Sequence, residues 1–357
     1  MRAVLVLSRN FGISLHQAKS MDQLFKIDLS DPASLQRYLL RKKWLKPGEQ
    51  VMKVEKPGEG NMNCVVRVIT ADRSFIVKQA RNYVEKYPSI AAPTERAVVE
   101  AAFYQTAQKN ASLKESMAEM INFDSENFIL KIEDLGRGAD YTFLYQPETK
   151  LTRDEAVALG HYLGRLHQIK LAETGSATFP SNFALRKLNH EHIFIFSYSY
   201  ENGFDLDTLQ PGLEDVARRY RQDEVLKKNV TRLGEWYLSR AGTTLVHGDF
   251  YPGSWLKIDG HLKVIDPEFS FPGWAEFDFG VMMAHAHLAN LSAEVQGWID
   301  ESYARPAGFD EKLANAVAGM EIIRRLIGLA QLPLVMDLHE KSILLETART
   351  MVLENCR

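Results

Sequence analysis

Three carboxylates lie close together in the segment HGDFYPGSWLKIDGHLKVIDPEF, residues 247–269. Asp249 precedes a short apolar stretch, and Asp266 and Glu268 follow it. Like charges held near one another in a partly buried cleft are costly unless a cation neutralises them. Carboxylate oxygens with room for water and phosphate suit Mg²⁺. The alternative is that these acidic side chains only cap surface turns.

An Asp-Gly dipeptide at 259–260 divides the apolar stretch into two halves. Asp-Gly is a strong signal for a two-residue hairpin turn, because glycine tolerates a positive φ. If that turn sets the register, Ser254 faces Ile265, and Ser254 and Asp266 emerge together at the open end of the hairpin. The spacing therefore predicts a metal site made from Ser254, Asp266 and Glu268, with the HGD carboxylate adjacent.

The tripeptide His247-Gly248-Asp249 supplies a second part of the same chemistry. Phosphotransferases place the base that orients an acceptor hydroxyl in the loop before their metal-binding residues. Phosphoryl transfer needs positioning and charge neutralisation from the protein more than covalent chemistry. We expect His247 to pack and hydrogen-bond within the loop rather than to take a proton.

The segments HGDFYPGS and IDPEF together resemble the catalytic and metal loops of the aminoglycoside phosphotransferase-like kinases, and within them the methylthioribose kinases. The resemblance implies a two-lobed, protein-kinase-like fold that uses ATP. It implies that Asp249 is the catalytic base and that Asp266 and Glu268 bind Mg²⁺. Ser254 stands where most relatives have Asn, which weakens one metal ligand, and Glu268 substitutes for it.

The N-terminal half contains segments that match the nucleotide site of this family. KPGEGNMN, residues 56–63, resembles the loop that covers the nucleotide. Its candidate residues are Gly58, Gly60, Asn61 and Asn63. The segment lacks a complete G-x-G-x-x-G, so by itself it is equally compatible with a plain turn.

A lysine and a glutamate complete the expected nucleotide site. Lys78 follows the apolar residues of FIVKQA, which indicates a buried stem and a head placed to reach ATP phosphates. Glu100, on the helix that begins near Thr94, is its expected partner. KIEDLG, residues 131–136, falls where the resemblance places the adenine-binding hinge, with Glu133 and Leu135 contributing backbone groups.

Two adjacent arginines, Arg324 and Arg325, lie in the apolar stretch EIIRRLIGLA. Buried guanidinium groups need an anion, which favours a functional role over a solvated pair. The stretch resembles the paired-arginine helix of the family, and the resemblance implies that the pair balances charge on the transferring phosphoryl group.

Some segments depart from the family or imitate another motif. Asp278-Phe279-Gly280 spells DFG, but Asp266 already fills the metal position. The resemblance implies that Asp278 is structural and braces the catalytic loop from a helix N-terminus. The residues expected to face the acceptor, 250–253 with Trp274 and Glu276, differ from those of methylthioribose kinases. The acceptor is therefore a methylthioribose-like pentose or another small hydroxylated metabolite of the aminoglycoside, choline or homoserine type. A nucleotide-binding pseudokinase with a regulatory role is the third alternative.

Periodicity indicates the elements that position these residues. Helices are predicted over 31–45, from Thr94 with a Thr–Glu capping pair, and from Leu151 with Thr152 as N-cap and Glu155 three residues later. A hairpin is predicted over 64–80, and two extended segments flank 124–127. The fold class is α+β and bilobal. We expect an extension of uncertain order at 1–20, a strand-rich nucleotide-binding lobe at 21–136, and a mostly helical catalytic lobe at 137–357, with the ligand between the lobes.

Composition excludes several classes of function. The 357 residues carry a net charge of −3, which gives no basic face for nucleic acid or an anionic membrane. The sequence has no segment approaching the roughly 20 apolar residues that span a bilayer. Two cysteines without metal or disulfide spacing favour the reducing cytoplasm. The expected partner is a small hydroxylated substrate, and a homodimer is an expectation of the family alone.

Overall fold

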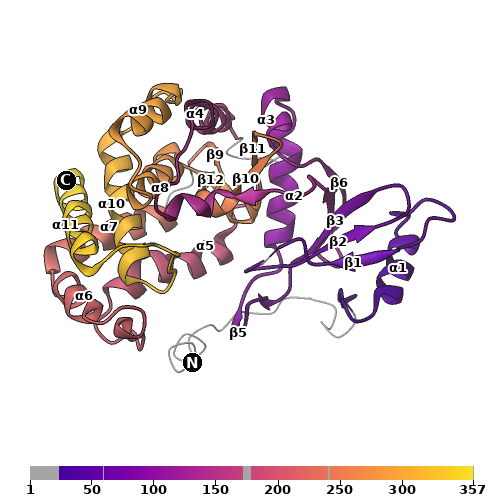
Figure 1. Cartoon of the computed structure of the whole chain (residues 1–357), viewed down its shortest axis with the longest axis horizontal. Coiled ribbons are helices and arrows are strands. Elements are labelled where there is room, and N and C mark those ends of the chain that lie inside the picture. Colours follow the sequence, from indigo (N-terminus) through magenta and orange to yellow (C-terminus); the bar gives the residue numbers. More distant parts are fainter. Residues whose placement is uncertain (1–23, 59, 172–177, 240–241, 357) are drawn as a thin grey trace. The chain divides into compact units, whose positions relative to one another are not determined.

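The structure is a computed structural model that describes residues 24–58, 60–171, 178–239 and 242–356. The extension predicted at 1–20 lies outside the described residues. The chain divides into two compact units, of which the first is Met1–Lys109 with Ala118–Gly136 and the second is Asn110–Met117 with Arg137–Arg357. The α+β fold class is confirmed, with a strand-rich N-terminal unit and a mostly helical C-terminal unit (Figure 1).

The first unit is built on a five-stranded antiparallel sheet in the order β1-β2-β3-β7-β6. A two-stranded ribbon, β4-β5, and two helices complete it. The strands are β1 Lys53–Glu55, β2 Cys64–Ile69, β3 Ser74–Gln79, β4 Tyr83–Val84, β5 Tyr87–Ala91, β6 Met120–Asp124 and β7 Ile129–Glu133, and the helices are α1 Pro32–Arg41 and α2 Arg96–Ala107.

Helix α1 packs on the sheet of this unit through one hydrophobic cluster. Asp31 caps the helix by accepting the N–H of Ser34 at 2.9 Å. The helix ends at Arg41, before the predicted Leu45, because Lys43 takes a left-handed φ of 58° and the Trp44 N–H turns back to Leu39 O. The predicted hairpin over 64–80 and the strands around 124–127 are confirmed.

The start of α2 differs from the prediction. The N-cap is Glu95, and it makes no side-chain capping bond. The Thr94–Glu95 pair is therefore not a capping box. The fully buried Arg96 instead fixes this end of the helix, since its guanidinium donates to the carbonyl oxygens of Pro93 and Arg81 at 2.6 and 2.7 Å.

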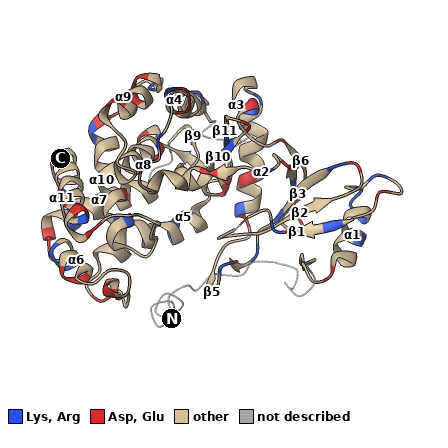
Figure 2. Ribbon diagram, viewed as in Figure 1, with Lys and Arg blue, Asp and Glu red and all other residues tan. Residues whose placement is uncertain are grey.

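The second unit contains nine α-helices among its described residues. They are α3 Ala111–Glu115, α4 Arg153–His167, α5 Phe183–His190, α6 Leu213–Arg221, α7 Glu224–Ser239, α8 Ala275–Leu288, α9 Ala293–Ser302, α10 Glu311–Ile327 and α11 Leu338–Asn355. Thr152 and Glu155 form the predicted capping box at the start of α4. In Figure 2 acidic and basic residues are interspersed along α6 and α11.

Short strands in the second unit carry the segments that are predicted to be catalytic. The hairpin of β10 Trp255–Ile258 and β11 His261–Val264 is extended by β8 Ala139–Asp140. A further antiparallel pair, β9 Thr244–Val246 with β12 Phe271–Gly273, was not predicted from the sequence. Each of these strands has only three residues, too few to show periodicity.

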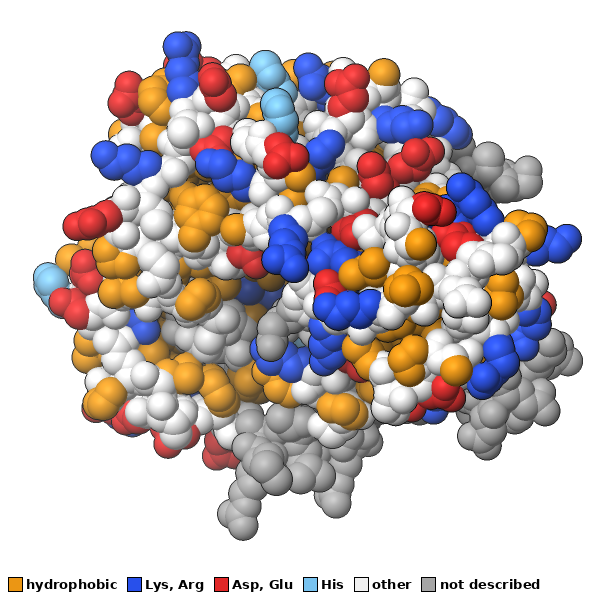
Figure 3. All heavy atoms as spheres, turned by 45° about the vertical axis from the view of Figure 1, so that its right-hand side comes forward, with side chains coloured by type: hydrophobic (Ala, Val, Ile, Leu, Met, Phe, Trp, Pro, Cys, Tyr) orange, Lys and Arg blue, Asp and Glu red, His pale blue; other side chains and the backbone are white. Residues whose placement is uncertain are grey.

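The helices and the surface bear on the classes of partner that the sequence analysis considered. None of the helices in the described part of the chain has the length and apolar character that crossing a membrane requires. Figure 3 shows acidic, basic and hydrophobic side chains interspersed on the face that it displays.

Candidate active site

The segment that carries the predicted base follows strand β9. The register places Val246 beside Phe271, so the chain leaves β9 next to the start of β12. Gly248 then takes a φ of +83°, and a Cβ at this position would lie 2.2 Å from the carbonyl oxygen of Phe269. Only glycine fits there, because both the dihedral angle and the close approach exclude a side chain.

Asp278 anchors this loop from the first turn of α8. Its Oδ2 accepts the backbone N–H of His247 at 2.6 Å, and its Oδ1 accepts that of Gly248 at 2.9 Å. Nε2 of His167 lies 3.3 Å from Oδ2. Asp278 has no exposed surface. The predicted bracing role of Asp278 is confirmed.

His247 links the loop to the end of β11. Its Nε2 lies 3.0 Å from Ile265 O, and the backbone N–H of Asp249 donates to Nδ1 at 3.4 Å. A carbonyl only accepts and an amide N–H only donates. Nε2 therefore carries the proton, and the unprotonated Nδ1 is the acceptor. His247 therefore hydrogen-bonds within the loop, as predicted.

Asp249 combines partial burial with a nearby arginine. Its side chain is 28% exposed, and its Oδ1 lies 3.8 Å from Nη2 of Arg325. Burial raises the pKa of Asp249 to about 6, against the lowering effect of Arg325 and Arg324. The negative charge of Glu268 raises it further. A carboxyl group with a pKa near neutrality suits a general base.

The hairpin brings the predicted metal ligands to one end. The β10-β11 register pairs Trp255 with Val264, and Ile265 N–H donates to Ser254 O at 3.0 Å, so the predicted register is confirmed. The Ser254 hydroxyl is buried and donates to the backbone carbonyl of Asp249 at 2.9 Å. Ser254 therefore ties the hairpin to the residue that carries the base.

Asp266 and Glu268 follow β11 directly. The side chain of Asp266 is exposed. Its backbone adopts the left-handed region, with φ 60° and ψ 50°, a conformation that costs a non-glycine residue about 1 kcal/mol. Glu268 is only 4% exposed. Backbone strain of this kind concentrates at functional sites.

Two carboxylates and a hydroxyl are the donors that the sequence predicts for Mg²⁺. This ion usually keeps waters and substrate phosphates among its six ligands, and such a donor set fits that requirement. Within residues 24–356, leaving aside the undescribed gaps, no group of three or more His, Cys, Asp or Glu side chains is arranged to hold a metal ion.

Asn182, which the sequence analysis missed, holds the segment around Glu268. Its Nδ2 donates to Glu268 O at 2.8 Å and to Ser270 O at 3.0 Å. The Ser270 hydroxyl donates in turn to Val246 O at 2.6 Å. Asn182 lies some 86 residues before Glu268 in the sequence, so no local signal could have revealed this contact.

The two arginines lie on α10 and are both buried. Their anion is Glu321, one turn earlier on the same helix, which the sequence analysis did not identify. Its oxygens lie 3.0 and 2.7 Å from Nη1 of Arg324, and Oε1 lies 2.6 Å from Nε of Arg325. The i+3 and i+4 spacing within EIIRR was a signal that could have found it.

The residues expected to face the acceptor divide into two groups. Tyr251 lies beside the site, because the guanidinium carbon of Arg325 is 4.8 Å from the centre of its ring. Trp274, in contrast, follows the end of β12 that pairs with Thr244. Its ring packs against that of Trp236 on α7, with the ring centroids 4.3 Å apart and the planes tilted by 33°. Glu276 is buried and accepts the Asp310 N–H at 2.8 Å. Trp274 and Glu276 thus have packing and capping contacts of their own, and their role toward the acceptor stays a prediction.

In the first unit the predicted pair of Lys78 and Glu100 is present. Nζ of Lys78, on β3, lies 2.9 Å from both carboxylate oxygens of Glu100, on α2. Both side chains are almost completely buried. A buried lysine held this way presents a fixed positive charge, as the phosphates of a nucleotide require.

The predicted nucleotide loop is anchored by Arg96, a second residue that the sequence analysis missed. Nε of Arg96 donates to Oδ1 of the buried Asn63 at 3.0 Å, and Nη2 donates to Met62 O at 3.0 Å. Asn61 O accepts the N–H of Lys86 at 3.0 Å. Around Gly58 a Cβ would meet nothing within 4 Å, and at Gly60 it would lie 3.1 Å from Asn63 O.

The predicted hinge follows β7. The Glu133 N–H donates to Glu119 O at 2.8 Å, so this amide belongs to the sheet edge. Leu135 lies in a turn that Arg67 holds, since the Arg67 guanidinium binds both oxygens of Asp134 at 2.8 and 2.9 Å and reaches Gly136 O at 2.7 Å.

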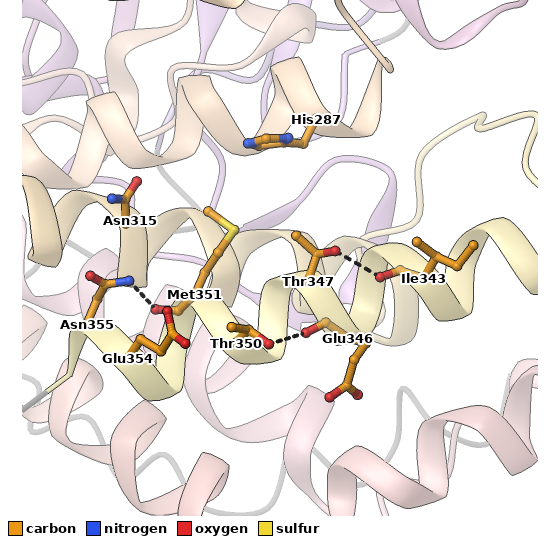
Figure 4. A pocket seen from close by; sticks show the side chains of 9 residues that line it. All are labelled: His287, Asn315, Ile343, Glu346, Thr347, Thr350, Met351, Glu354 and Asn355. Carbon is orange, nitrogen blue, oxygen red and sulfur yellow. Dashed lines mark hydrogen bonds between the residues drawn. The ribbon is translucent and has the colours of Figure 1, made fainter. Parts of the chain in front are cut away.

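A cavity of about 710 Å³ lies on helices α8, α10 and α11, away from all the predicted site residues. Figure 4 shows His287 above a row of α11 side chains that includes Thr347, Thr350 and Met351. The hydroxyls of Thr347 and Thr350 donate to carbonyl oxygens of their own helix. The cavity does not bring together groups that could transfer a phosphoryl group.

Comparisons with known proteins place this chain among the phosphotransferases. Residues 53–309 match the model of a family described as the phosphotransferase enzyme family. Methylthioribose kinases of Bacillus cereus (strain G9842) and Bacillus anthracis (strain CDC 684 / NRRL 3495) are each 27% identical over 79% of this chain and 80% of their own length.

Two solved structures are also similar to this chain. Choline kinase LicA from Streptococcus pneumoniae matches at 13% identity and a TM-score of 0.48, over 89% of this chain and 99% of that one. Spectinomycin phosphotransferase, in complex with ADP and spectinomycin, matches at 12% identity and a TM-score of 0.49, over 90% and 98%.

Proposed function

Because the chain belongs to the phosphotransferase enzyme family, we propose that this small-molecule kinase transfers the γ-phosphoryl group of ATP to a hydroxyl of a methylthioribose-like pentose, with Mg²⁺. One observation carries the proposal: a loop fixed on both sides holds Asp249 beside the hairpin end that bears Asp266 and Glu268. Asp278 fixes the loop from α8, and Ser254 fixes it from the hairpin.

In this proposal Asp249 accepts the proton of the acceptor hydroxyl. Its raised pKa gives it affinity for that proton, and at pH 7 it is still ionised and ready to accept. Arg325, beside Asp249, and Arg324 counter the negative charge that develops on the phosphoryl oxygens.

Asp266, Glu268 and Ser254 would hold Mg²⁺, which supplies neutralisation of the phosphate charge. Lys78, fixed by Glu100, contacts the phosphate oxygens of ATP, and the loop with Gly58, Gly60, Asn61 and Asn63 covers the nucleotide. Backbone groups at Glu133 and Leu135 face the adenine in the same proposal, with the Glu133 carbonyl taking the larger part because its N–H is engaged.

The choice of acceptor rests on the methylthioribose kinases that are 27% identical to this chain. Tyr251, whose ring lies next to the guanidinium group of Arg325, is the acceptor-side residue with a place at the site. Its ring and hydroxyl suit a sugar, which presents both an apolar face and hydroxyls.

The test is ADP release from ATP and Mg²⁺ with a panel of methylthioribose, ribose, 5-deoxyribose, choline, homoserine and an aminoglycoside. Asp249→Asn is expected to lower turnover at least 10³-fold with nucleotide binding retained. Asp259→Asn is the matched control, because Asp259 occupies the hairpin turn, where Asn fits the same positive φ.

Each outcome has a separate meaning. Asp249-dependent turnover of methylthioribose that EDTA abolishes supports the proposal in full. Turnover of another acceptor refutes the pentose and keeps the kinase. Tight MgATP binding without turnover on the whole panel refutes the proposed acceptor class and favours the regulatory pseudokinase.

A further inference from the structure

Glu321 lies at the centre of a buried polar cluster that connects three segments of the second unit. It is fully buried on α10 and contacts both arginines. Although burial raises its pKa, Arg324 and Arg325 hold the pKa of Glu321 well below its ordinary value, so Glu321 is ionised. One carboxylate thus faces two guanidinium groups, and the cluster has one surplus positive charge.

The surplus charge is directed toward the catalytic loop. Arg325 uses Nε for Glu321 and places Nη2 3.8 Å from Oδ1 of Asp249. Nε of Arg324 is among the buried nitrogens without a hydrogen-bond partner in the described residues. Donors in a buried cluster that the protein leaves unused are available to an anionic group that enters the site.

Glu321 is itself held in place by His285 and Tyr145. His285, on α8, has Nε2 3.3 Å from Oε1 of Glu321, and its Nδ1 lies 2.6 Å from the hydroxyl of Tyr145. Burial lowers the pKa of His285 to about 4, so the ring is neutral. The ionised Glu321 only accepts, which places the proton on Nε2 and makes Tyr145 the donor to Nδ1.

We infer that Tyr145, His285 and Glu321 are positioning residues that orient the two arginines for phosphoryl transfer. The chain of donors runs in one direction, from the Tyr145 hydroxyl to His285 and from His285 to Glu321. Glu321 then holds two guanidinium nitrogens, Nη1 of Arg324 and Nε of Arg325, through three hydrogen bonds. This inference rests on the proposed function, because the arginines act there on the transferred group.

An ordinary ion pair that stabilises the fold would give the same distances, so the test must separate the two roles. The chain offers a matched control in the second unit: Glu214 binds the buried Arg221 at 2.5 Å on α6, away from all the predicted site residues. Glu214→Gln removes the same charge from the same kind of pair and is expected to leave kcat within about twofold.

Glu321→Gln is expected to lower kcat about 10- to 100-fold with the KM for MgATP within about threefold, as removal of an orienting contact does. Tyr145→Phe removes a single hydroxyl at the far end of the chain and is expected to lower kcat about threefold in the same pattern. It also serves as the test if Glu321→Gln fails to fold. A kcat within twofold of wild type in both variants, or an equal loss in Glu214→Gln, would overturn the inference.

A second measurement does not depend on turnover. In ¹⁵N-arginine-labelled protein the Nε–H resonance of Arg325, assigned by its loss in Arg325→Lys, should be sharp and protected from exchange. Tyr145→Phe should broaden it and speed its exchange. If the Arg325 resonance is unchanged in Tyr145→Phe, the positioning role is refuted even where the kinase proposal holds. If the resonance changes but the wild type phosphorylates no acceptor, the kinase proposal alone is refuted.

Discussion

The bracing of the catalytic loop by Asp278 makes a quantitative prediction. Asp278→Asn keeps the size of the side chain but offers one acceptor oxygen to two backbone N–H groups, those of His247 and Gly248. The remaining N–H then faces an amide NH₂ in a fully buried place. Leaving one buried donor unsatisfied costs about 1–3 kcal/mol, and losing the ionic partner of the other adds about 1 kcal/mol.

We therefore expect the local opening of the loop to become easier by about 3 kcal/mol, which is a factor of about 10² in amide exchange. Hydrogen exchange followed by mass spectrometry on a peptide covering 245–250 measures it, and kcat should fall at least tenfold. Asp310→Asn is the control, because Asp310 also accepts two backbone N–H groups, at the start of α10, where Asn caps equally well. Exchange within threefold of wild type in Asp278→Asn would refute the reasoning.

Three further predictions concern the same loop. Gly248→Ala should lower the free energy of unfolding by about 3 kcal/mol or more and remove most of the activity, because the new Cβ would lie 2.2 Å from Phe269 O. Gly260→Ala, at a φ of +80° but in open space, should lower it by only about 1 kcal/mol. Equal melting temperatures of the two variants would contradict this. The pKa of Asp249, raised from 3.8 to about 6, predicts that acceptor kcat/KM falls below pH 6 as the base becomes protonated. The folded protein binds this proton more tightly than the unfolded protein, so the wild type loses stability as the pH rises from 4 to 6 and Asp249 ionises. Asp249→Asn should therefore be more stable than wild type by about 2 kcal/mol at pH 7 and equally stable at pH 4. Urea unfolding at both pH values measures this difference.

Local sequence signals predicted the parts of the site that depend on neighbouring residues. The Asp-Gly turn determined the hairpin register and hence the meeting of Ser254 with the segment of Asp266. The capping box of Thr152 and Glu155 formed as expected. These features depend on dihedral preference and hydrogen bonds within a few residues, which the order of amino acids encodes directly.

Contacts between distant segments were outside the reach of such signals. Asn182 holds the Glu268 segment across 86 residues, and Tyr145 reaches His285 across 140. The β9-β12 register, which no periodicity reveals, places Trp274 directly after the residue that pairs with Thr244. Lys78 and Glu100 were paired correctly because the family resemblance, and not spacing, supplied their partnership.

The left-handed backbone at Asp266 limits which variants of this protein can exist. A φ of 60° is tolerated by Gly, Asn and Asp and disfavoured for β-branched residues, whatever their charge. In a library with all twenty residues at position 266, selection for folding alone would enrich those three. If Asp266 binds Mg²⁺ as proposed, selection for catalysis would then retain only Asp among them. The difference between the two enriched populations would separate the requirement of the backbone from that of the proposed metal site.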